Sequence, residues 1–211
     1  MRLLLVADVH DGAKKAEAIP GNFDAVIAAG DFTYRRSFEA AAEALETLAR
    51  VAPVYFVPGN TDPPELAHYE NSAVKPIHGR TASLGPYTVG GAGGSLPTPF
   101  DDLFRVTEEE LDSLLRSLTP TPHILVTHNP PRGLLDKVGR TRPVGSTAVR
   151  RYMEEKQPLL SVHGHIHEDR GIDMLGGTVV VNPGPLKDGF YAEAVLDGTK
   201  LTVRLRKISA P

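Results

Sequence analysis

Five short polar clusters occur along the chain, and each contains residues that bind divalent metal ions. Aspartate, asparagine and histidine supply the oxygen and nitrogen ligands that cations of intermediate hardness prefer. The chain has no cysteine, so a metal site could use no thiolate ligand. The residue types therefore predict metal-ion chemistry. The clusters are Asp8-Val9-His10, Gly30-Asp31, Gly59-Asn60-Thr61-Asp62, Thr127-His128-Asn129 and Gly164-His165-Ile166-His167.

Each cluster follows a short apolar run that is typical of a buried strand. The runs are Leu3 to Ala7, Ala25 to Ala29, Val54 to Val57, Ile124 to Val126 and Leu159 to Val162. In open α/β sheets, ligands bind in the crevice outside the carboxyl ends of the strands. We therefore expect the five clusters to converge on one site.

Other segments predict the helices and strands around that site. Amphipathic spacing predicts a helix over Ser37 to Arg50, and a capping-box pattern at Thr107 predicts a second. A third helix is expected over Gly145 to Lys156. The C-terminal part alternates short β-rich runs with glycine turns, which favours antiparallel pairing. These runs are Ile172 to Leu175, Thr178 to Asn182, Tyr191 to Leu196 and Leu201 to Leu205. Together the segments predict an α/β fold of two packed mixed sheets flanked by helices.

The ordered clusters resemble the calcineurin-like metallophosphoesterase superfamily, whose pattern runs D-x-H, G-D, G-N-H-[D/E], H and G-H-x-H. The likeness extends from Asp8 to about Pro185. The resemblance implies a four-layer αββα sandwich, and we expect residues 1–211 to form a single domain of this type. Further stretches resemble small prokaryotic members: Gly90 to Gly94, His128 to Pro131, His163 to Glu168 and Asn182 to Gly184.

The resemblance also implies a pair of metal ions and their ligands. One cation would bind Asp8, His10, Asp31 and His167, and the second would bind Asp31, Asn60, His128 and His165. Asp31 would then bridge the two ions. Mixed oxygen and nitrogen ligands suit Mn, Fe, Co, Ni or Zn alike. A hydroxide shared by the two ions would be the nucleophile, with Asp31, Asn60 and His128 as the central catalytic residues and Asn60 also contacting substrate.

One position departs from the superfamily pattern. Thr61 occupies the place where many members have a histidine that assists the leaving group. Threonine cannot donate a proton near neutral pH, so general-acid help worth about 10²- to 10⁴-fold would be absent or supplied elsewhere. We expect either a bias towards good leaving groups or a surrogate donor, such as His163 or metal-bound water.

Neighbouring residues have both structural and functional interpretations. Asp62 and His163 are expected behind the ligands, where they would orient them. Asn129 fits either a phosphate contact or a turn before two prolines. The Gly90 to Gly94 run is predicted to form a tight loop near the mouth of the site. Five arginines are expected in loops on the same side, mostly solvated: Arg35, Arg36, Arg132, Arg140 and Arg142.

Composition limits the partners. The 211 residues carry a net charge of −3 without a run of Lys and Arg, which disfavours binding to duplex DNA or RNA. The apolar run at Leu3 to Ala7 is too short for a signal peptide or a membrane span, and the lack of cysteine is compatible with a reducing cytosol. We expect a cytoplasmic protein without membrane contact.

The leading hypothesis is a metal-dependent phosphoesterase that hydrolyses phosphodiesters of small molecules or nucleotides. The preference for diesters comes from the likeness to small prokaryotic relatives with a residue other than histidine after the motif asparagine. A phosphomonoesterase is the near alternative. A non-catalytic scaffold of the same fold is a further alternative, although a scaffold has no physical need for the complete ligand set. The sequence carries no signal for the oligomeric state.

Overall fold

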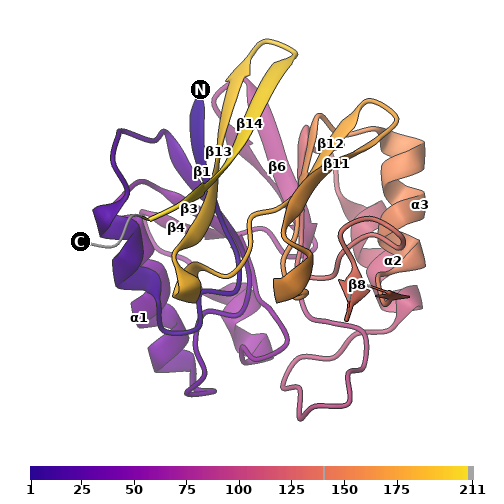
Figure 1. Cartoon of the computed structure of the whole chain (residues 1–211), viewed down its shortest axis with the longest axis horizontal. Helices are drawn as coiled ribbons and strands as arrows, with labels where there is room; N and C mark the ends of the chain where they lie inside the picture. Colours follow the sequence, from indigo (N-terminus) through magenta and orange to yellow (C-terminus); the bar gives the residue numbers. More distant parts are fainter. Residues whose placement is uncertain (140, 209–211) are drawn as a thin grey trace.

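The computed structural model describes residues 1–139 and 141–208 and contains two six-stranded sheets that pack face to face (Figure 1). The first sheet has the order β14-β13-β1-β2-β3-β4. Its strands β1 to β4 are mutually parallel, whereas β13 pairs antiparallel with both β1 and β14. The bounds are β1 Arg2–Val6, β2 Ala25–Ala29, β3 Val54–Val57, β4 Val74–Pro76, β13 Phe190–Asp197 and β14 Lys200–Lys207.

The second sheet has the order β11-β12-β10-β7-β6-β5, with four parallel central strands and antiparallel strands at both edges. The bounds are β5 Thr81–Leu84, β6 Tyr87–Ala92, β7 Ile124–Thr127, β10 Leu160–Val162, β11 Gly171–Leu175 and β12 Thr178–Asn182. A separate two-stranded ribbon is formed by β8 Lys137–Val138 and β9 Arg142–Pro143.

In the residues that the structure describes, three α-helices cover the outer faces of the sheets, with α1 on one side and α2 and α3 on the other (Figure 1). The bounds are α1 Phe38–Ala49, α2 Glu108–Ser117 and α3 Thr147–Lys156. Ser37, Thr107 and Ser146 cap the three N-termini, and Thr107 with Glu110 forms a complete capping box. The connections also contain short 3₁₀ helices: η1 Ala13–Ala18, η2 Pro64–His68, η3 His167–Asp169 and η4 Leu186–Asp188.

In the described residues, three clusters of buried apolar side chains fill the spaces between the layers. On β1, Leu4 and Val6 face α1, whereas Leu3 and Leu5 face the second sheet. Strands buried on both faces are expected to have continuous apolar sequences, which explains why these runs lack alternation. The third cluster lies between the second sheet and the helices α2 and α3. The predicted four-layer αββα sandwich is therefore confirmed.

The Gly90 to Gly94 run was predicted to form a tight loop, and this prediction was wrong for residues 90–92. Gly90, Gly91 and Ala92 belong to β6, which pairs with β7 inside the second sheet. A Cβ at residue 91 would overlap the Val126 carbonyl oxygen, so the glycine permits a close backbone approach within the sheet.

No helix in the described parts of the chain is long and apolar enough to cross a membrane.

Candidate metal centre

The candidate ligands converge from the carboxyl ends of strands in both sheets. Asp8 and His10 follow β1, Asp31 follows β2, and Asn60 follows β3 of the first sheet. From the second sheet, His128 follows β7, and His165 and His167 follow β10. The candidate site therefore lies across the seam between the two sheets, at the strand ends where the sequence pattern predicts the clusters to converge.

Asp31 occupies the centre of the site and faces an imidazole with each carboxylate oxygen. Its Oδ2 lies 3.6 Å from His10 Nε2, and its Oδ1 lies 3.6 Å from His128 Nε2. Only 3% of Asp31 is exposed. A carboxylate in this arrangement could bridge two cations, one on each side.

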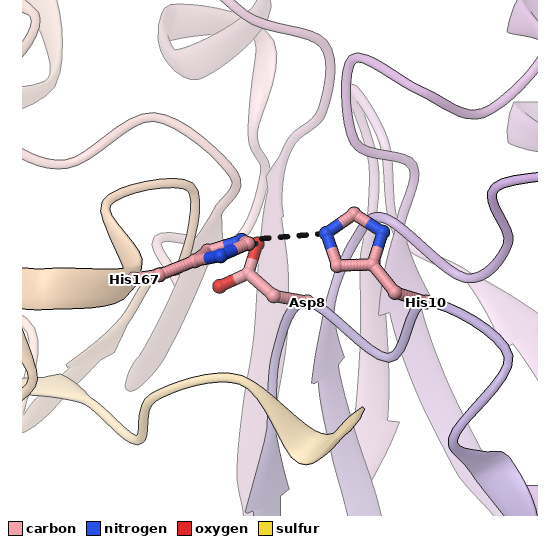
Figure 2. A group of neighbouring side chains, drawn as sticks. All are labelled: Asp8, His10 and His167. Atoms are coloured by element: carbon pink, nitrogen blue, oxygen red, sulfur yellow. Dashed lines mark hydrogen bonds and ion pairs between the residues drawn. The ribbon is translucent and has the colours of Figure 1, made fainter. Parts of the chain in front are cut away.

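The first group of potential ligands combines Asp8, His10 and His167, whose ligand atoms lie within 4.8 Å of one another. Figure 2 shows the imidazoles of His10 and His167 pointing toward each other beside the Asp8 carboxylate. Their Nε2 atoms are 3.3 Å apart, and His167 Nε2 lies 3.5 Å from Asp8 Oδ1. These distances suit three ligands that share one cation.

The second group contains Asp8, Asp31 and His128, again within 4.8 Å of one another. Asn60 joins this group, because its Oδ1 lies 2.9 Å from His128 Nε2. The His165 ring lies 5.0 Å from the His128 ring, centroid to centroid. The structure thus brings all seven predicted ligands together, although His165 is outside both compact groups.

The hydrogen bonds of His128 test whether a cation fits. His128 Nδ1 lies 2.8 Å from the Ala29 carbonyl oxygen, which can only accept, so Nδ1 carries a proton. In the neutral ring Nε2 then presents a lone pair toward Asn60 Oδ1, which is also an acceptor. A divalent cation between these two acceptors satisfies both, so this donor set fits a metal ion.

Burial and neighbouring charges shift the acid–base equilibria of the site. Burial alone would raise the pKa of Asp8, but its hydrogen bond with His167 and the nearby His128 and His10 hold it below its usual value. Burial and the neighbouring His128 lower the pKa of His165 to about 4. Burial lowers the pKa of His10 as well. Neutral imidazoles are the form that binds metal, so these shifts favour metal binding at His10 and His165. At His128 and His167 burial opposes the effect, but the nearby carboxylates raise the pKa.

The backbone of the site is held in an uncommon conformation. Asp8, His10, Asp31 and His165 have positive φ angles of 49°, 41°, 58° and 72°. Non-glycine residues in this region cost about 1–3 kcal/mol each and cluster at functional sites. Gly59 permits a further close approach, because a Cβ there would overlap the Asp31 carboxylate and backbone nitrogen.

Asp62 lies directly behind Asp31. Its carboxylate accepts hydrogen bonds from the backbone N–H groups of Asp31, Phe32 and Gly59, each at 2.8 Å. Burial and the neighbouring Asp31 raise the pKa of Asp62 to about 7, against the opposing effect of these hydrogen bonds. The residue therefore fixes the two loops that carry Asp31 and Asn60.

The hydrogen bonds of Asn129 support the interpretation as a turn residue and not the predicted contact with substrate. Its Nδ2 donates to the Gly94 carbonyl oxygen and its Oδ1 accepts from the Leu96 N–H, and only 2% of the residue is exposed. Both ends of the amide are thus occupied by the 94–96 backbone.

His163 is completely buried, with Nδ1 near the Gly164 carbonyl oxygen, so it has no access to a substrate.

The arginines have ordinary surface contacts. Arg35 pairs with Asp11 at 3.8 Å, Arg36 pairs with Asp101 at 3.1 Å, and Arg142 lies in β9. The side chain of Arg132 has no described contact with the candidate ligands, although its backbone N–H donates to the Ser146 carbonyl oxygen. Arg140 lies outside the described residues.

Two residues that the sequence did not single out contact candidate ligands, and a third lies beside one of these two. The Tyr34 ring stacks on His10 at 4.0 Å, and the ammonium group of Lys187 lies 5.6 Å from the Tyr34 ring centroid. Asp102 accepts a hydrogen bond from Asn60 Nδ2 at 2.8 Å. Tyr34 and Asp102 lie in loops and Lys187 lies in η4, and each is far in sequence from the residue it approaches, so no spacing pattern could identify them.

The chain is similar to known proteins in sequence and in fold. Residues 1–195 match the model of the calcineurin-like phosphoesterase superfamily domain. An uncharacterized protein of Methanocaldococcus jannaschii is 32% identical over 196 residues, which cover 88% of each chain. A crystal structure of a Thermus thermophilus protein has a TM-score of 0.70 at 20% identity and covers 99% of each chain. The purple acid phosphatase of yellow lupin seeds has a TM-score of 0.58 at 13% identity, covering 98% of this chain and 51% of that one. The two solved structures share the fold, and the match of the family model shows that this chain belongs to the calcineurin-like phosphoesterase superfamily.

Proposed function

We propose that the chain hydrolyses phosphoesters with two divalent metal ions held at the seam between the sheets. Asp8, His10, Asp31 and His167 would hold one ion, and Asp31, Asn60, His128 and His165 would hold the other. The observation that carries this proposal is the central position of Asp31, whose two oxygens face His10 and His128 at equal distances of 3.6 Å. We also propose that residues 1–211 act as one domain, since β13 pairs with β1 across most of the sequence.

The chemistry divides between the ions and the protein. Two bound divalent cations supply the positive charge that activates water and stabilises the phosphoryl oxygens. Asp31, Asn60 and His128 would hold that charge at the reacting centre. Lys187 adds a positive charge beside Tyr34, near His10, where an anionic substrate would approach.

Thr61 points to the class of substrate. Its backbone N–H donates to Asp31 Oδ1 at 2.9 Å, and its hydroxyl lies 3.4 Å from the Thr33 carbonyl oxygen. Neither group can protonate a leaving group near neutral pH. The proposal therefore favours substrates with good leaving groups. Its preference for small-molecule or nucleotide phosphodiesters over monoesters rests on the likeness to small prokaryotic relatives with a residue other than histidine at this position. The cytoplasmic location stays an expectation from the sequence.

The test compares a chromogenic aryl phosphodiester with the matching monoester on chelator-stripped protein reloaded with Mn²⁺, Ni²⁺, Zn²⁺ or Mg²⁺. We expect metal-dependent cleavage with a faster rate for the diester. A faster rate for the monoester would assign a phosphomonoesterase instead. Absence of turnover in protein that binds two equivalents of metal would favour a non-catalytic scaffold.

An Asp31→Asn variant tests the site itself. Asparagine keeps the volume but removes the charge and one oxygen ligand, so the variant should lose the bridge and nearly all hydrolysis. Asp173→Asn, an exposed position on β11, is the matched control and should keep full activity. Wild-type turnover in metal-loaded Asp31→Asn would overturn the assignment.

A further inference from the structure

We propose that Asp102 is a positioning residue that sets which end of the Asn60 amide faces the second metal ion. This inference rests on the proposed function. Asp102 is 42 residues from Asn60 in sequence, and its Oδ1 accepts a hydrogen bond from Asn60 Nδ2 at 2.8 Å. Its side chain is only 1% exposed, although the residue lies in a surface loop.

The loop around Asp102 holds Asn60 at a second point. The backbone N–H groups of Leu103 and Phe104 donate to the Asn60 carbonyl oxygen at 2.8 and 3.2 Å. Residues 102–104 therefore hold both the backbone and the side chain of Asn60. This pair of contacts fixes the position of the residue as well as the direction of its amide.

The Asp102 carboxylate is itself fixed within the loop. Thr98 donates to it from its backbone N–H at 3.0 Å and from its hydroxyl at 2.8 Å, and Arg105 Nε lies 3.4 Å from Oδ2. The base of the loop is closed by backbone hydrogen bonds that link Ser95 with Phe104 and Val106. The carboxylate is thus presented to Asn60 in one orientation.

The chemistry of the two groups explains why this matters. The oxygen and nitrogen ends of an asparagine amide have nearly the same shape, so packing alone does not distinguish them. An ionised carboxylate can only accept hydrogen bonds, so Asp102 binds the NH₂ end and excludes the flipped amide. Asn60 Oδ1 is then directed toward His128 Nε2, where the second ion would lie. The charged acceptor also increases electron density on Oδ1, as outer ligand contacts do in other metal sites.

Titration of stripped protein with Mn²⁺ by isothermal calorimetry tests the proposal without requiring turnover. Wild type should bind two equivalents. Asp102→Asn should weaken one of the two sites by about 10- to 100-fold and leave the other unchanged. Asp101→Asn is the matched control, because its side chain is 92% exposed and pairs with Arg36 instead of Asn60. It should leave both sites unchanged.

A polarity swap separates positioning from general loop structure. Asn60→Asp alone should weaken the second site, because two carboxylates would then face each other. In the double variant Asn60→Asp with Asp102→Asn, residue 102 can donate to residue 60, and much of the affinity should return. Unchanged Mn²⁺ affinity in Asp102→Asn, or equal losses at both sites without recovery in the double variant, would overturn the inference. Failure of wild type to bind two equivalents would instead contradict the proposed function.

Discussion

The Asp62 carboxylate accepts the backbone N–H of Asp31 at 2.8 Å, so one buried acid holds another at the centre of the site. The same carboxylate binds the N–H groups of Phe32 and Gly59, and no part of Asp62 is exposed. The loops after β2 and β3 are therefore joined by a single side chain. Its removal should affect both the stability of the protein and the shape of the site.

Asp62→Asn should lower the free energy of unfolding by at least about 3 kcal/mol, because the new amide group would face buried N–H donors. Urea denaturation of metal-free protein measures this loss. Asp173→Asn, an exposed change of the same chemistry, should alter stability by less than about 0.5 kcal/mol. Equal stabilities for the two variants would show that the three hydrogen bonds contribute little.

Gly59→Ala should abolish binding of at least one metal ion. The added methyl group would overlap the Asp31 carboxylate, and the backbone there leaves no room for adjustment. Gly177→Ala is the control, since a Cβ at that position would lie 3.7 Å from its nearest neighbour, Gln157. Calorimetry with Mn²⁺ compares the two. Two full equivalents bound by Gly59→Ala would mean that the loops around Asp31 adjust more freely than the structure implies.

Thr61→His should change the dependence of rate on the leaving group. The imidazole would supply a general acid beside Asn60, so poor leaving groups should gain about tenfold or more relative to good ones. A series of aryl phosphodiesters with different phenol pKa values gives this ratio. Thr61→Gln, which is polar but cannot donate a proton in this pH range, is the control. A ratio equal to that of wild type would show that general-acid help is already provided elsewhere.

Glu108 should make stability depend on pH at the acid end. The residue belongs to α2 and accepts hydrogen bonds from the Ser146 hydroxyl and the N–H groups of Thr147 and Ala148 at the start of α3. Although burial opposes the effect, these hydrogen bonds lower the pKa of Glu108 below its usual value of 4.5. The stabilisation is therefore complete above pH 4.5 and is lost as the pH falls through the lowered value.

Glu108→Gln tests this pH dependence. At pH 7 the variant should be less stable than wild type by about 1–3 kcal/mol, through loss of charge-assisted hydrogen bonds. The difference in unfolding free energy should shrink as the pH is lowered below 4.5. Glu109→Gln, an exposed change in the same helical turn, should show neither effect. A difference that is constant from about pH 7 to about pH 3 would contradict the prediction.

The strands and helices were largely predictable because their signals are local. The runs at Ala25–Ala29, Val54–Val57 and Thr178–Asn182 have the same bounds as β2, β3 and β12, since fully buried strands have continuous apolar sequences. The helix starts at Ser37 and Thr107 follow from side-chain caps that the sequence displays. The glycine-rich strand β6 was missed, because glycine normally marks a turn and only the neighbouring strand requires it here.

The convergence of the candidate ligands was predictable from the sequence, but the residues that support them were not. Asp8, Asp31 and His128 follow strands that bring them together, so their order in the sequence determines their convergence. Asn129 could not be resolved, because a turn before proline and a phosphate contact use the same residue. No feature of the sequence identifies Asp102 as a neighbour of the site, since its contact with Asn60 depends on how a loop from the other sheet folds back.

The placement of the ligands on both sheets has a consequence for how the halves of the molecule are aligned. The interface between the sheets is made of aliphatic and aromatic side chains such as Leu5, Ile27 and Val126. Apolar burial stabilises the contact between the two layers but has little directional preference of its own. Metal coordination is directional. Ions shared between Asp31 of the first sheet and His128 of the second would therefore constrain the position of one sheet relative to the other.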